Sequence, residues 1–133
     1  MKKVAVLFGG NSDEKEVSLH TGLSVIEAIK EDYDITSINM QDDYSDLYKK
    51  LIDIDVVFIA LHGGYGEDGR LQKYLNKHNI KYTGSGFLAS NIAMDKNKTK
   101  IIAKKHGVPI IEWEMVNKGQ ESISTNLEFP LII

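Results

Sequence analysis

A glycine-rich loop that carries a histidine and acidic residues follows an apolar run near the middle of the chain. The run covers residues 56–60, and the loop covers residues 62–73 and contains His62, Glu67 and four glycines. Ligands of open α/β folds bind at the carboxyl ends of parallel strands, so an imidazole and a carboxylate in this position form a candidate site. The same residues also fit an ordinary strand-to-helix turn, in which glycines supply positive φ and acids favour the helix dipole.

A second candidate loop follows the first apolar run, residues 4–8, which is typical of a strand buried on both faces. Two glycines end this run, and an amphipathic helix is predicted from Asp13 onward, with Ser12 or Asp13 as its N-cap. Glu14 lies at the start of that helix. It is either a solvated first-turn acid or a binding carboxylate. We expect the two loops to face one crevice, because they follow neighbouring strands.

Strands and helices are predicted to alternate along the first part of the chain, which favours a parallel sheet with right-handed crossovers. The predicted helix at the start carries Leu19, Leu23, Val25, Ile26 and Ile29 on one stripe. Further strands are expected at residues 33–40, 56–61 and 80–83. A basic helix is expected after residue 95, a strand near residues 113–116, and another strand from residue 129 to the end. Because that last apolar run stops unfinished, we expect a longer parent protein.

Composition limits the possible functions. The chain has 133 residues, of which 42% are hydrophobic and 26% charged, with a formal net charge of -3 and no cysteine. Mixed charge argues against nucleic-acid and membrane binding. The absence of cysteine excludes disulfides and thiolate metal sites, and fits a cytoplasmic location. No metal-ligand spacing is visible among the histidines.

Taken together, the ordered motifs resemble the D-alanine:D-alanine ligase family of ATP-grasp enzymes across essentially the whole chain. The segments that carry the resemblance are residues 4–19, 60–63, 66–69, 82–86 and 94–96. The resemblance implies a Rossmann-like, three-layer α/β domain with a mainly parallel sheet over residues 1–84, the pre-ATP-grasp domain. It also implies that residues 85–133 are the truncated start of the central ATP-binding domain.

The implied activity is ATP-dependent ligation of two D-alanines. The carboxylate of one D-alanine is phosphorylated, and the amine of the second attacks the acyl phosphate to give D-alanyl-D-alanine for peptidoglycan. The resemblance implies ATP and Mg²⁺ as cofactors, D-alanine and ATP as partners, and a homodimer in the cytoplasm. The family's metal-binding acids and second ATP lysine would follow residue 133, so this chain alone is expected to be inactive.

The resemblance also assigns roles to individual residues. Glu14 would hold the ammonium of the first D-alanine, and Val17 would line the pocket for its methyl group, although a core valine fits that position equally. His62 would lie beside the same D-alanine, with Glu67 holding its tautomer and orientation. Lys96 would contact ATP. The sequence departs from the family pattern at Lys73 and Lys81, where a small residue and a proline are usual.

Two other classes of protein compete with this interpretation. A non-catalytic α/β module of the receiver or flavodoxin type would use acids at the sheet end for regulation or for flavin binding. Such a module does not require the His62 and Glu67 loop or Lys96. A dinucleotide-binding Rossmann domain is disfavoured, because residues 8–12 lack the spaced G-x-G-x-x-G turn.

Overall fold

The computed structural model describes residues 1–41, 44–120, 125–128 and 130. The chain divides into two compact units, Met1–Met94 and Asp95–Ile133. In the part of the chain that is described, every helix is too short or too polar to cross a bilayer.

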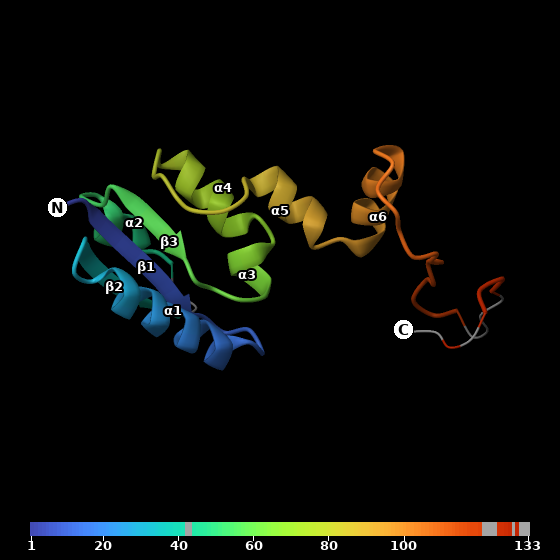
Figure 1. The fold of residues 1–133 in the computed structure, drawn as a ribbon, viewed down its shortest axis with the longest axis horizontal. Helices are drawn as coiled ribbons and strands as arrows, with labels where there is room; N and C mark the ends of the chain where they lie inside the picture. Colours follow the sequence, from blue (N-terminus) through green and yellow to red (C-terminus); the bar gives the residue numbers. More distant parts are fainter. Residues whose placement is uncertain (42–43, 121–124, 129, 131–133) are drawn as a thin grey trace. The chain divides into compact units, whose positions relative to one another are not determined.

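The first unit is built on a parallel sheet of three strands, β1 (Lys3–Gly9), β2 (Asp34–Met40) and β3 (Val56–Ile59), in the order β2-β1-β3 (Figure 1). In the register, Leu7 of β1 lies opposite Ile38 of β2 and Ile59 of β3. All the apolar side chains of β1 are buried, as expected for a central parallel strand covered on both faces. The predicted parallel sheet is confirmed.

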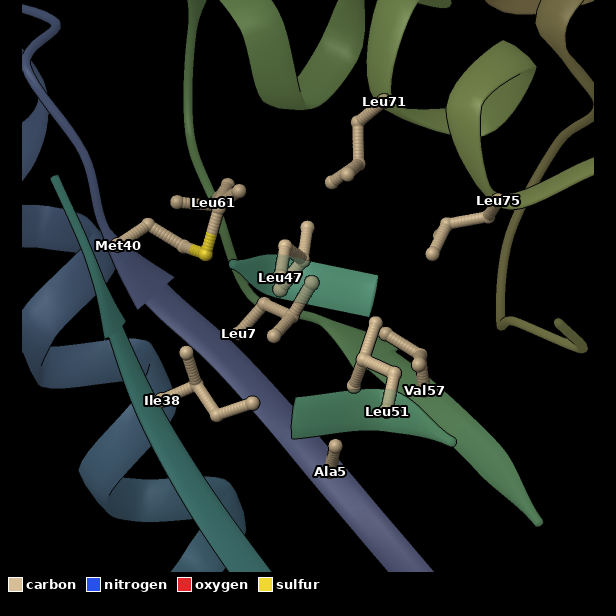
Figure 2. Packing of buried hydrophobic residues seen from close by; sticks show 10 residues of the cluster. All are labelled: Ala5, Leu7, Ile38, Met40, Leu47, Leu51, Val57, Leu61, Leu71 and Leu75. Atoms are coloured by element: carbon tan, nitrogen blue, oxygen red, sulfur yellow. The ribbon is translucent and has the colours of Figure 1, made fainter. Parts of the chain in front are cut away.

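Alternating side chains of β1 point to opposite faces of the sheet, and each face is covered by helices. Val4, Val6 and Phe8 pack toward α1 (Lys15–Ile29). On the opposite face, Ala5 and Leu7 share a core with α2 (Leu47–Leu51) and α4 (Arg70–Lys77), whose leucines point toward the sheet in Figure 2. This arrangement is the predicted three-layer α/β fold.

Helix α1 lies close to the sheet because small residues make its inner surface. Ser18 and Gly22 are its buried residues, and a Cβ on Gly22 would collide with the ring and Cβ of Phe8. Leu23, expected on the apolar stripe, is instead 59% exposed. The prediction that Leu23 belongs to the apolar stripe was therefore wrong. Gly22 makes the closest contact between the helix and the sheet, and the next residue, Leu23, points away from it.

Two shorter helices, α3 (Gly64–Glu67) and α5 (Phe87–Ala93), complete the first unit. The strand expected at residues 80–83 is reduced to a single parallel bridge between Val57 and Tyr82. Its hydrogen bonds run from Val57 N to the Lys81 carbonyl, 2.8 Å, and from Thr83 N to the Val57 carbonyl, 2.9 Å. The segment therefore pairs with β3 at one residue only.

The second unit contains the predicted basic helix, α6 (Lys96–Lys105). The Asp95 carboxylate caps it by accepting a hydrogen bond from Lys98 N at 3.0 Å. Trp113 donates from Nε1 to Asn97 Oδ1 at 2.8 Å, which fastens the following segment to the helix. The strand expected at residues 113–116 is wrong, since these residues are irregular. Most of the apolar run at residues 129–133 lies outside the described residues.

Candidate functional site

The buried side chain of Ser18 joins the carboxyl ends of β1 and β3 to α1. Its Oγ accepts a hydrogen bond from Gly9 N and donates one to the Ala60 carbonyl, each 2.8 Å long. Both candidate loops begin just beyond these two backbone groups. They therefore start from fixed points at the same edge of the sheet, which is where parallel α/β folds bind ligands.

The two loops also contact each other directly through Ser12. Its hydroxyl donates to the His62 carbonyl at 2.6 Å and accepts from Glu14 N at 3.3 Å. The predicted N-cap position differs by one or two residues, because Glu14 rather than Ser12 or Asp13 directly precedes the helix, and Glu14 makes no capping hydrogen bond through its side chain. The Ser12 hydroxyl thus links the two loops and also accepts a hydrogen bond from the turn that leads into the helix.

Glu14 lies against the loop that carries the histidine. Gly63 follows His62 with φ 67° and ψ 170°, a region essentially restricted to glycine. A Cβ built on Gly63 would lie 2.7 Å from Glu14 Oε2. The glycine therefore leaves room for the carboxylate beside the backbone of the histidine loop. The structure thus places the Glu14 carboxylate beside the loop that carries His62.

The His62 imidazole has a protein group near each ring nitrogen. Thr21 Oγ1 lies 2.9 Å from Nε2, and Glu67 Oε1 lies 3.9 Å from Nδ1. The second distance is too long for a hydrogen bond, but it leaves the carboxylate facing the ring. About a third of the histidine side chain, 32%, remains exposed. The ring is thus oriented by its neighbours and still accessible.

Thr21 was not among the residues singled out from the sequence. On a helix, positions 14, 17 and 21 fall on one side, so this threonine shares a face with Glu14 and Val17. The helical spacing was visible in the sequence. The contact with His62 was not, because it joins residues 41 positions apart.

Val17 lies on the surface of α1 and is 52% exposed, which excludes the alternative of a core valine. An open groove of about 420 Å³ runs along this side of the helix. Its lining residues are Val17, His20, Thr21, Ser24, Val25 and Ala28. Glu14 is not part of this lining, but its helical spacing places it on the same side of α1 as Val17.

A second, narrow pocket lies between the two loops, with walls from both. Its lining residues are Gly9, Gly10, Asn11, Ser12, Tyr44, Leu61, His62, Gly63, Tyr65 and Gly66. Its volume is about 10 Å³. That space holds no more than about one water molecule. The loops alone therefore do not enclose an amino acid, and a bound substrate would need further walls.

An aromatic and charged cluster braces the histidine loop. Tyr65 stacks on Tyr44 with ring centroids 4.2 Å apart, and the Arg70 guanidinium lies 5.2 Å from the Tyr65 centroid. Burial, with help from the Tyr44 and Tyr74 hydroxyls, raises the pKa of Tyr65, and the hydrogen bond to the Asp68 carboxylate raises the pKa of Arg70. With both pKa values raised, Tyr65 stays neutral and Arg70 stays charged at neutral pH. The ring stacking and the contact between the guanidinium and the ring therefore persist at that pH.

No three His, Asp or Glu side chains among the described residues converge on a point where they could hold a metal ion. Lys96 lies in the second compact unit, exposed at the first residue of α6. An exposed lysine can supply positive charge to a phosphate. Nothing else in the structure bears on its predicted contact with ATP, which stays a prediction.

Comparison with known proteins identifies the family. The model described as D-ala D-ala ligase N-terminus matches residues 3–51 and 42–85, which together cover most of the first unit. The chain belongs to this family. Curated members of similar sequence include the D-alanine--D-alanine ligases of Syntrophotalea carbinolica, 42% identical over 133 residues, and Carboxydothermus hydrogenoformans, 48% identical over 140 residues. These alignments cover 99% and 98% of this chain, but only 43% and 45% of the two ligases.

Solved structures of the family agree with this fold. The ligase of Bacillus anthracis complexed with ATP superposes with a TM-score of 0.82 at 39% identity, over 92% of this chain and 40% of that one. The VanG D-Ala:D-Ser ligase of Enterococcus faecalis gives a TM-score of 0.72 at 28% identity, over 84% of this chain and 43% of that one. The chain thus spans less than half the length of each of these four ligases.

Proposed function

We propose that this chain is the N-terminal part of an ATP-dependent ligase that joins two D-alanines into D-alanyl-D-alanine, the dipeptide used in peptidoglycan. Relatives with 40–48% identity that carry the name D-alanine--D-alanine ligase support the activity of the parent. Within the structure, the observation that carries the proposal is the position of the Glu14 carboxylate against Gly63, the residue that follows His62 in the chain.

The residues of this edge would bind and orient the first D-alanine. Glu14 would accept hydrogen bonds from its ammonium group, a charge-assisted contact that fixes the amino acid at one end. Val17, on the same side of α1, would contact the methyl group. His62 would lie beside the bound amino acid, with Glu67 facing the far side of its ring. Holding the substrate in one orientation is what brings its carboxylate into a defined place for reaction.

The chemical step would use groups outside the described residues. A carboxylate becomes electrophilic once one of its oxygens is part of a phosphate leaving group, and ATP would supply that phosphate. Lys96 would contact ATP, while Mg²⁺ and most contacts to the nucleotide would come from the rest of the parent. We also propose the division of the parent into a substrate domain, residues 1–84, and a central domain beginning at residue 85. We further propose that the parent acts as a homodimer in the cytoplasm.

The test is phosphate release from ATP by the full-length parent, measured with D-alanine, with L-alanine and with no amino acid. We expect release with D-alanine only. Glu14→Gln should lower kcat/KM for D-alanine by about 100-fold or more, because it removes a charged contact that orients the substrate. Glu16→Gln, an exposed first-turn acid of the same helix, is the matched control and should change the rate little.

Two results would contradict the proposal. Equal phosphate release with either enantiomer would show that the site does not recognise D-alanine. Binding of a flavin or of a regulatory phosphate without D-alanine-dependent turnover would favour the receiver or flavodoxin-like module instead. The 133-residue chain by itself should make no dipeptide, and synthesis by pure material would show that the remaining domains are dispensable.

A further inference from the structure

The contact between Thr21 and His62 joins the middle of α1 to the histidine loop across 41 positions of sequence. Thr21 Oγ1 is 2.9 Å from His62 Nε2, and the pair is partly buried. On the other side of the ring, Glu67 Oε1 faces Nδ1 at 3.9 Å. A polar protein group therefore faces each nitrogen of the imidazole.

These two neighbours differ in what they can do. An ionised carboxylate only accepts hydrogen bonds, whereas a threonine hydroxyl can donate or accept. At 3.9 Å the Glu67 carboxylate makes no hydrogen bond to the ring, but its negative charge favours the proton of the neutral imidazole on Nδ1. The Thr21 hydroxyl, 2.9 Å from Nε2, can then donate to the lone pair on that nitrogen. In general the hydrogen bond at one imidazole nitrogen decides which nitrogen carries the proton.

We propose that Thr21 is a positioning residue that holds the His62 ring and its Nδ1–H tautomer in the first D-alanine site, a role that rests on the proposed function. A threonine in a helix adopts mainly two χ1 rotamers, so its hydroxyl has few positions available. The helix that carries it is itself fixed to both strand ends by Ser18.

This arrangement makes α1 the common support of the site. Glu14 and Val17 lie on the same side of the helix as Thr21, and Thr21 contacts the imidazole. The carboxylate that would hold the ammonium and the ring that would lie beside the substrate are thus positioned by one rigid element. Their separation does not depend on the conformation of the glycine-rich loop alone.

The direct test is ¹⁵N NMR of the chain labelled at histidine nitrogens, with the His62 signals assigned through His62→Gln. In the native chain, we expect the Nδ1–H tautomer of His62 to predominate in the neutral ring. Thr21→Val removes the hydroxyl and keeps the shape, and it should shift the population toward the other tautomer. Thr21→Ser keeps the hydroxyl and should preserve the native spectrum. Thr21→Ala serves as a second hydroxyl-free variant if valine disturbs folding, which far-UV circular dichroism monitors.

Kinetics of the full-length parent give a second readout. Thr21→Val should raise KM for D-alanine about five-fold, the weight of one neutral hydrogen bond, with a smaller effect on kcat, and Thr21→Ser should restore KM. Identical His62 spectra in native, valine and alanine chains would overturn the inference whatever the activity. If the His62 spectrum changes in Thr21→Val but the full-length parent shows no D-alanine-dependent turnover, the positioning role of Thr21 is supported and the proposed function is contradicted.

Discussion

Replacing Ser18 with alanine tests whether one hydroxyl holds the edge of the sheet together. The Ser18 side chain has no exposed surface, and its oxygen is the partner of the Gly9 N–H and the Ala60 carbonyl. Alanine would leave both backbone groups buried without that partner, at about 1–3 kcal/mol each, or about 2–6 kcal/mol together. Alanine's better helix propensity returns about 0.5 kcal/mol. The net loss of unfolding free energy is therefore about 1.5–5.5 kcal/mol.

Urea unfolding of the chain, followed by far-UV circular dichroism, measures this loss. Circular dichroism is the suitable probe because Trp113 belongs to the second compact unit and its fluorescence would report on that unit. The matched control is Ser24→Ala, an exposed serine of the same helix that gains the same helix propensity. A difference of about 2 kcal/mol corresponds to a fall in Tm of roughly 8–16 °C for a unit of this size.

The comparison between the two alanine variants shows whether the Ser18 hydrogen bonds stabilise the fold. If Ser18→Ala and Ser24→Ala unfold within about 0.5 kcal/mol of each other, the two buried hydrogen bonds contribute nothing net. The role of Ser18 in joining the two strand ends would then be refuted. The common origin of the two loops would have to depend on the pairing of β1 with β3 alone.

Two further predictions concern Gly63 and Asp95. Gly63→Ala should destabilise the fold by about 1–3 kcal/mol through its backbone conformation, and it should raise KM for D-alanine in the parent, because its Cβ displaces the Glu14 carboxylate. The control is Gly84→Ala, which is also at positive φ but in open space and should therefore affect stability alone. An unchanged KM in both variants would contradict the reasoning. The hydrogen bond from Lys98 N, and then the one from the Lys98 side chain, lowers the pKa of Asp95 below 3.8, so the cap is complete above that pH and is lost as pH falls through the lowered pKa. The NMR chemical shift of the Lys98 amide should follow this transition, and the transition should be missing in Asp95→Asn. A midpoint above 3.8 would show that the cap is absent.

Much of the first unit could be predicted from local pattern. An uninterrupted apolar run at residues 4–8 predicted a strand covered on both faces, and β1 is that central strand. The pattern was less informative for α1, where Ser18 and Gly22 form the inner surface and Leu23 points outward. Hydrophobic periodicity assumes that large residues face the core, and it fails where helix and sheet approach too closely for a side chain.

In the candidate site, too, some residues could be predicted from the sequence and others could not. Glu14 and His62 could be proposed from the sequence because each follows an apolar run at a position where parallel strands end. Thr21 could not, since nothing in a helical stripe tells which of its polar residues meets a loop 41 positions away. The distance between the Glu67 carboxylate and the imidazole also required coordinates, and at 3.9 Å it is longer than a hydrogen bond.

Local sequence was enough to predict the alternation of strands and helices up to β3, the glycine-rich loops and the residue types at the sheet edge, because these depend on neighbours a few positions apart. Only the tertiary structure decided that Ser18 joins two strand ends, that Gly63 leaves room for Glu14, and that Thr21 meets His62. The physical reason is that such contacts depend on the distance and rotation at which α1 packs on the sheet. That close packing is possible because Gly22 has no Cβ, which would collide with Phe8.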